Sequence, residues 1–220
     1  MRIVAMLSIG FALVLLSVPL HAGEVKVGVV AVQLSPPSGY CEMDKSYDYD
    51  KTLEANTAKL AEGAGNSFFG LFLDCDGLKR ARPTKEFIST KIIIQGTKLG
   101  VAEVKNIQAT CDELKTLKVA DQQKGMQDNV KKNSGGNTLG DQSGLGVLDE
   151  VKDEVCYYGL IQNIVASGKN VRLLTIFASA LRKHSIFFIY DVQPLDSTSV
   201  AATLAHLKSV YADFAKANPD

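Results

Sequence analysis

The clearest alternation of apolar and polar positions lies in the last third of the chain, over residues 171–216. Two apolar runs there, residues 171–181 and 185–190, flank the basic triplet Arg182-Lys183-His184. Two such runs joined by a short polar turn are typical of a β-hairpin. Residues 186–189 are apolar without alternation, which predicts an interior strand buried on both faces.

The segment after Pro194 has the spacing of an amphipathic helix. Asp196 or Ser197 is a suitable N-cap, because a short polar side chain can accept a hydrogen bond from the first free amides. The apolar stripe of this helix consists of Val200, Leu204, Leu207, Tyr211 and Phe214. We therefore expect the closing helix to lie across the sheet that contains the hairpin.

The rest of the chain mixes strand and helix patterns. Strands are predicted at residues 24–33, 86–95 and 147–164, from their β-branched and alternating character. Helical spacing runs from Lys51 to about Asp76, with a bend at residues 63–67 leading into a second, shorter helix. Another helix is predicted from about Leu99, and its apolar stripe includes Cys111. The predicted fold class is α+β: a mostly antiparallel sheet with helices packed on it.

One segment departs from this pattern. Residues 121–145 contain five glycines among Gln, Asn, Lys and Asp, with few apolar side chains to bury. Long stretches without predicted structure are usually disordered or act as lids over a site. The sequence therefore predicts a flexible polar loop here, within a single domain over residues 23–220.

The N-terminus has the pattern of a secretory signal. A basic start at Met1-Arg2 is followed by an apolar run from Ile3 to Val18 and by small residues near Ala22. This arrangement predicts a signal peptide over residues 1–22, because a spanning helix needs a longer apolar run of about 20 residues. We expect a periplasmic or secreted protein with no membrane segment after cleavage.

Composition limits the partners. The 24 Lys and Arg residues balance the 24 Asp and Glu residues, so no global field attracts nucleic acid or an anionic membrane. Hydrophobic residues make up 46% and charged residues 22%, which is typical of a folded domain. The expected partner is a protein of the periplasm, and oligomeric state stays open.

Four cysteines follow the signal segment: Cys41, Cys75, Cys111 and Cys156. An even number in an oxidising compartment predicts two disulfides, and no close C-x-x-C pair favours a metal. A bend at residues 63–67 allows Cys41 to reach Cys75, and the inward face of the predicted helix favours Cys111–Cys156. The cross-pairings remain open.

No constellation of catalytic, cofactor-binding or metal-binding residues is evident. The two histidines after the signal segment, His184 and His206, are interpreted as surface residues because they lie in a turn and off a helical stripe. Aromatic and proline side chains gather between residues 36 and 49, and such residues are frequent at recognition surfaces. The candidate partner surface consists of Pro36, Pro37, Tyr40, Tyr47 and Tyr49. Packing of the same rings over the edge of the core is the alternative.

Three short stretches resemble uncharacterised exported proteins of Gram-negative bacteria: residues 36–41, Asp74-Cys75 and residues 145–148. With the hairpin and closing helix, the order of elements also resembles a PsbP-like α/β/α sandwich. That resemblance implies a lumenal or periplasmic accessory protein that binds a larger complex. It supplies no catalytic residues, and a fold does not fix a function.

The leading functional hypothesis is thus a non-enzymatic periplasmic binding or accessory protein that uses no cofactor. A hydrolase with its site under the 121–145 loop is one alternative. A periplasmic inhibitor or immunity protein is the other.

Overall fold

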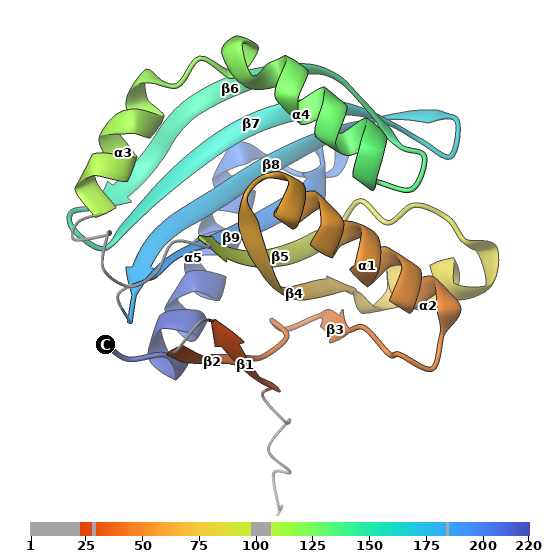
Figure 1. Ribbon diagram of the computed structural model, residues 1–220, viewed down its shortest axis with the longest axis horizontal. Helices are drawn as coiled ribbons and strands as arrows, with labels where there is room; N and C mark the ends of the chain where they lie inside the picture. The colour runs from red at the N-terminus through yellow and green to blue at the C-terminus, as the bar shows by residue number, and fades with distance from the viewer. Residues whose placement is uncertain (1–22, 28–29, 98–106, 184) are drawn as a thin grey trace, which may run out of the picture.

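The computed structural model describes residues 23–27, 30–97, 107–183 and 185–220 (Figure 1). The centre is a seven-stranded antiparallel sheet with the order β3-β4-β5-β9-β8-β7-β6. In that order the strands are β3 (Tyr40–Glu42), β4 (Asn66–Asp74), β5 (Lys91–Thr97), β9 (Ser185–Pro194), β8 (Lys169–Arg182), β7 (Val155–Ala166) and β6 (Thr138–Val151). A separate two-stranded sheet consists of β1 (Gly23–Val27) and β2 (Val30–Leu34).

Helices cover both faces of the large sheet (Figure 1). One face carries α1 (Asp48–Gly63), α3 (Ile107–Thr116) and α4 (Val119–Asn133), whereas α5 (Val200–Ala217) lies on the other. The short helix α2 (Cys75–Thr84) follows β4, and the 3₁₀ turn η1 (Leu195–Ser197) precedes α5. The predicted class, α+β with a mostly antiparallel sheet and helices packed on it, is confirmed.

The central strands are apolar on both faces because each face has its own covering layer. On β8, Leu174, Ile176 and Ala178 are fully buried in the core shared with α5. The alternate residues Thr175 and Phe177 point toward α1, α3 and α4, since successive strand side chains point to opposite faces. Strand β9 is interior, as the unbroken apolar run at residues 186–189 predicts.

Helix α5 closes the core on its side of the sheet. Leu207, Tyr211 and Phe214 of the predicted stripe are buried. The helix begins later than expected, because the predicted caps fall in η1 and Ser199 is the N-cap, accepting from the Ala202 amide at 3.2 Å.

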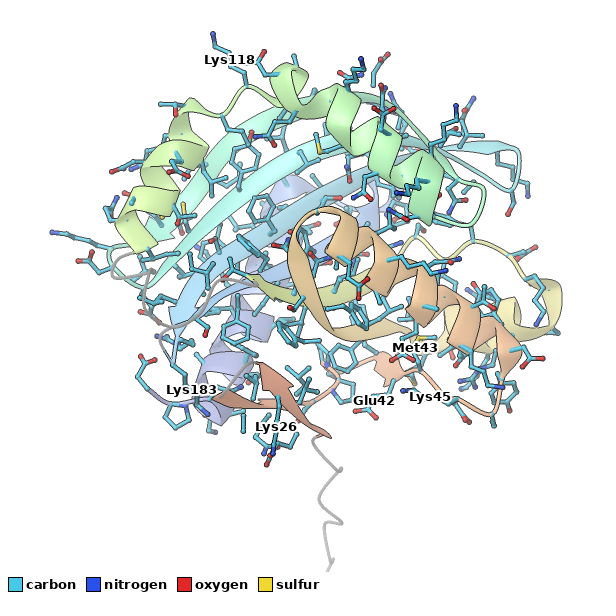
Figure 2. The ribbon with its side chains drawn as sticks, in the orientation of Figure 1. Lys26, Glu42, Met43, Lys45, Lys118 and Lys183 are labelled. Atoms are coloured by element: carbon cyan, nitrogen blue, oxygen red, sulfur yellow. A yellow bond between two sulfur atoms is a disulfide. The ribbon has the colours of Figure 1, made fainter. Side chains whose placement is uncertain are left out.

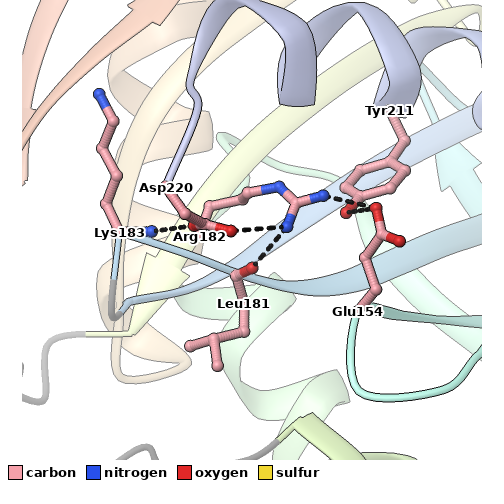
Figure 3. A network of polar contacts seen from close by, with 6 residues as sticks. All are labelled: Glu154, Leu181, Arg182, Lys183, Tyr211 and Asp220. Carbon is pink, nitrogen blue, oxygen red and sulfur yellow. Dashed lines mark hydrogen bonds and ion pairs between the residues drawn. The ribbon is translucent and has the colours of Figure 1, made fainter.

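A charged network joins α5 to the sheet (Figure 3). Arg182 donates to Glu154 at 2.5 Å and to Asp220 at 3.2 Å. Tyr211 also donates to Glu154, at 3.0 Å, and the Lys183 amide donates to Asp220 at 3.0 Å. The network connects the β7 end of the sheet, the β8–β9 turn and α5.

The predicted strand over residues 24–33 is two strands, β1 and β2, that pair with each other. Val32 and Leu34 of β2 are buried in the core under α5. Asn218 fixes β2 to the end of α5, since its side chain accepts from the Gln33 amide at 2.8 Å and donates to the Gln33 carbonyl at 2.9 Å.

The expectation of a second, shorter helix after the bend at residues 63–67 is wrong. The chain reverses there, but it continues as strand β4. Phe72 packs in the α5 core, and the adjacent Leu71 and Leu73 pack in the cluster with α2. A strand buried on both faces is as apolar as a buried helix, so periodicity alone cannot separate the two.

The flexible polar loop expected over residues 121–145 is also wrong, because this segment consists of α4 and the first half of β6. Its glycines include sites of close packing. A Cβ atom at Gly144 would lie 2.7 Å from the Tyr158 hydroxyl and 2.9 Å from the Val119 side chain. The absence of a side chain therefore serves close contact between layers at this position.

The predicted signal peptide over residues 1–22 lies outside the described residues. Within the described ranges, no helix combines the length and apolar character needed to span a membrane.

Candidate functional site: a cavity between the sheet and three helices

A cavity of about 600 Å³ lies between the sheet and the layer formed by α1, α3 and α4. Its floor comes from β5, β9, β8 and β7 with Leu139 of β6, and its roof from the inner sides of the three helices. The helical layer is linked across the roof, where Asn129 of α4 donates to the Leu60 carbonyl of α1 at 3.0 Å. Lys118, between α3 and α4, points outward from this layer (Figure 2).

The roof explains why α4 forms from so polar a segment. No residue of α4 is fully buried, but Val119, Met126 and Val130 line the cavity. The three apolar positions are separated by seven and four residues, which places them on one helical face. Helix α4 therefore turns a narrow apolar stripe toward the cavity and its charged residues toward solvent.

The floor of the cavity carries a cluster of four aromatic rings. Phe177 of β8 contacts three neighbouring rings, with centroid distances of 5.5 Å to Tyr158, 5.4 Å to Tyr190 and 6.3 Å to Phe188. Strand pairing sets this cluster, because Phe177 is opposite both Tyr158 and Tyr190. Burial raises the pKa of Tyr158 and Tyr190, so both hydroxyls remain protonated donors in the physiological range.

The floor has few polar side chains, and hydrogen bonds fix several of them. Thr175 donates to the Gln162 side-chain oxygen at 2.9 Å. Gln95 accepts from Asn66 at 3.1 Å. A mainly apolar wall with a small number of fixed polar groups is the usual composition of a small-molecule site.

Lys91 is the one cationic side chain among the described residues that line the cavity. It starts β5, and its alternation with Ile93 and Gln95 puts it on the floor of the cavity. Its ammonium lies 5.0 Å from the centroid of the Phe87 ring, and no ion pair with a carboxylate is present among the residues described. Desolvation lowers its pKa to about 8, because burial disfavours the charged form.

The described residues of the lining do not include the catalytic sets expected for a hydrolase under residues 121–145. Glu113 is the single carboxylate, and no Ser or His is among the described residues of the lining. Two carboxylates, or a Ser and His pair, are common catalytic sets for acid–base or nucleophilic hydrolysis. What the arrangement can do is enclose an apolar or amphipathic molecule.

On the opposite face of the sheet, His206 is joined to a buried carboxylate. Its Nδ1 is 2.6 Å from Asp191, which is fully buried and also accepts from Gln193 at 2.7 Å. Tyr40 stacks on His206 with ring centroids 5.5 Å apart. The interpretation of His206 as an ordinary surface residue is wrong, because about two thirds of its side chain is covered. His184 lies outside the described residues.

The residues of the candidate partner surface each have contacts within the chain. Tyr40 accepts from Gln193 at 2.8 Å, and Tyr49 donates to the Glu86 carbonyl at 2.6 Å. Tyr47 is the most exposed of the three rings, at 45%, and lies under the Arg82 guanidinium. Pro36 and Pro37 line a small groove beside α5. A role of these residues in binding a partner stays a prediction.

The cysteines form one disulfide, Cys41–Cys75, which confirms the first predicted pairing. The structure brings Cys111 and Cys156 together in the interior, but as thiols, so the expectation of a second disulfide is corrected. Burial raises the pKa of both thiols, which keeps them protonated and unreactive.

These two thiols and the Glu150 carboxylate are the one candidate metal-binding group in the described ranges, with all three ligand atoms within 4.8 Å of one another. Lys115 is 2.8 Å from the same carboxylate and competes with any cation for it. Three groups are also fewer than the four protein ligands usual for structural zinc.

Sequence reasoning missed the cavity and its lysine. The available signal was the position of Lys91 two residues before Ile93 in a strand expected to be central. A lysine on the inward face of a buried strand requires a partner or a cavity. Comparison of the sequence with protein-family models and with curated proteins gave no match.

Proposed function

We propose that this chain is an exported, non-enzymatic binding protein, and that its ligand is a small, mainly apolar molecule held between the sheet and α1, α3 and α4. One observation carries the proposal: the cavity of about 600 Å³ with the aromatic cluster on its floor. Ligand pockets typically have about 300–1,000 Å³ and largely apolar walls. An empty apolar cavity of this size destabilises the folded protein. A molecule that fills the cavity removes this cost, and the gain contributes to its binding free energy.

Export is supported by two independent features. Residues 1–22 have the pattern of a signal peptide. The Cys41–Cys75 disulfide is compatible with an extracellular location, since disulfides persist in oxidising compartments. A binding protein of the periplasm is the function that combines these features with the cavity. Its resemblance to PsbP-like accessory proteins is compatible with delivery of the bound molecule to a larger complex.

Displacement of a neutral apolar dye, N-phenyl-1-naphthylamine, tests the proposal. Leu160→Trp places a large ring on the cavity floor from β7. Val165→Trp is the matched control, because Val165 is on the same strand, is 37% exposed and is outside the cavity lining. Met126→Trp fills the cavity from α4 and replaces Leu160→Trp where that variant does not fold.

We expect the wild-type chain and Val165→Trp to bind the dye with equal affinity. The cavity-filling variants are expected to bind at least about tenfold more weakly, because the added ring occupies the ligand volume. A folded Leu160→Trp variant with wild-type affinity would exclude the cavity as the binding site.

A further inference from the structure

The fully buried charges in the described part of the chain, Asp50 and Asp191, are paired, whereas the half-buried Lys91 has no carboxylate partner there. Asp50 is fully buried and accepts from Arg82 at 3.1 and 2.7 Å. Asp191 is fully buried and bonded to His206 and Gln193. Lys91 lines the cavity and has no ion pair with any carboxylate in the described part of the chain. A desolvated ammonium without an anion is unfavourable, so this position favours an anionic ligand group.

Strand register places Lys91 at one end of a row across the cavity floor. Lys91 of β5 is opposite Val192, Val192 is opposite Thr175, and Thr175 is opposite Leu160 of β7. All four residues line the cavity. Neighbouring strands are about 4.8 Å apart, so the backbone positions of this row span about 14 Å from Lys91 to Leu160. Apart from the Thr175 hydroxyl, which bonds to Gln162, the row beyond Lys91 is apolar.

Glu113, the other charged residue among the described residues of the lining, does not repel an anion bound at the Lys91 end of the row. Glu113 is on α3, which packs mainly on β6, β7 and β8. It is also exposed to solvent. The lining therefore has its positive charge at the β5 side and its negative charge at the side of α3.

We propose that the ligand is an aliphatic carboxylate, with its head paired to Lys91 and its tail lying across β9 and β8 toward Leu160 and Ile164 on β7. This inference rests on the proposed function, since it assigns the chemistry of a ligand in the same cavity. The lowered pKa of Lys91, about 8, is compatible with it: at neutral pH the ammonium is charged and available to a carboxylate. No bond is formed or broken, so the association requires no co-reactant.

The test compares dodecanoate, dodecanol and dodecylamine as competitors of N-phenyl-1-naphthylamine at neutral pH. The three share a tail and differ in the charge of the head. We expect dodecanoate to bind the wild-type chain at least about tenfold more tightly than dodecanol, because a hydrogen-bonded charge pair in a desolvated site is worth more than a neutral contact. Dodecylamine is expected to bind most weakly. This comparison uses the wild-type chain alone, so it does not depend on the folding of a variant.

Lys91→Met removes the charge and keeps an apolar stem of similar length. We expect it to lose the preference for dodecanoate and to bind dodecanol at least as well as the wild-type chain does. Lys115→Met, which removes an exposed charge of α3 outside the lining, is the control and is expected to retain the preference.

Failure of the carboxylate assignment and failure of the proposed function give different results. Equal affinity of the wild-type chain for dodecanoate and dodecanol overturns the carboxylate assignment and leaves the cavity as a binding site for neutral molecules. The same holds if folded Lys91→Met retains the full preference. If neither the dye nor any of the three competitors binds the wild-type chain, the proposed function itself fails.

Discussion

His206 and Asp191 form a 2.6 Å contact that reaches from α5 to the interior of the sheet. Asp191 is fully buried on β9, so the imidazole supplies part of the compensation for a desolvated carboxylate. The contact explains why His206 is partly covered although it lies off the apolar stripe of α5. It also makes the stability of the protein dependent on pH.

The hydrogen bond to Asp191 raises the pKa of His206 above its ordinary value. The folded chain therefore holds a proton that the unfolded chain releases. The stabilising contribution is complete below the unfolded pKa of about 6.5 and is lost as pH rises through the higher folded pKa. We expect His206→Gln to cost most at about pH 5.5 and progressively less toward about pH 8.5. Thermal unfolding of both proteins across this range measures the difference; a difference independent of pH would contradict the account.

Arg82 is expected to stabilise the fold through Asp50. Both Asp50 oxygens accept from the guanidinium, and the Asp44 amide also donates to Asp50 at 2.9 Å. Arg82→Met leaves the buried carboxylate without its cation, which is expected to cost about 3 kcal/mol. Lys79→Met is the control, because Lys79 pairs with Asp76 at an exposed site. Urea unfolding measures the free energy of unfolding of the two variants. Equal small losses would mean that the buried pair contributes no more than the exposed pair.

The Cys41–Cys75 disulfide closes a loop across 34 residues. The chain-entropy model gives about 4 kcal/mol for a loop of this length. We expect the double variant Cys41→Ser/Cys75→Ser to lose about this much stability. Reductant is expected to lower the stability of the wild-type chain by a similar amount and to leave the double variant unchanged. Wild-type stability that is unaffected after complete reduction would contradict a stabilising role.

Lys91 is expected to make the ligand-free protein more stable at alkaline pH. Burial lowers its pKa from 10.5 to about 8, so between these values the unfolded chain binds more protons than the folded chain. Stability contributed by this group therefore rises with pH over that window. The cavity also contains the titratable groups Tyr158, Tyr190 and Glu113. These groups are present in both the wild-type chain and Lys91→Met, so the comparison isolates the contribution of Lys91. We expect the stability of the wild-type chain relative to Lys91→Met to increase from about pH 8 to about pH 10. A constant difference would mean that the ammonium is solvated.

The last third of the chain was the most predictable part because its pattern has one interpretation. Residues 171–190 alternate or are apolar throughout, and the basic turn separates β8 from β9 cleanly. The stripe of α5 identifies Leu207, Tyr211 and Phe214 as core residues. In these elements, local pattern and tertiary packing agree.

Two segments were mispredicted because tertiary contacts decide them. Strand β4 is buried on both faces, so its apolar residues also fit a helical stripe. In residues 121–145, the glycines were interpreted as flexibility, but Gly144 allows Tyr158 and Val119 to approach the backbone. A close contact between distant segments leaves no local signature in the sequence.

The cavity was unpredictable for a related reason. Its lining comes from eight helices and strands that are far apart in sequence, and most of the lining residues on the strands are typical of an ordinary core. On the described strands of the lining, Lys91 departs from that pattern as a charged residue at an inward position of β5. The structure is needed to show that the space above Lys91 is not filled by the helical layer.

The central claim is that the cavity between the sheet and α1, α3 and α4 holds the ligand. A crystal structure of the protein with ω-bromododecanoate tests it most directly, since the anomalous signal of bromine locates the end of the tail. The account predicts a bromine peak inside the cavity near Leu160 and Ile164, with the carboxylate at Lys91. Bromine peaks confined to the outer surface, with the cavity empty at a saturating concentration of the compound, would contradict it.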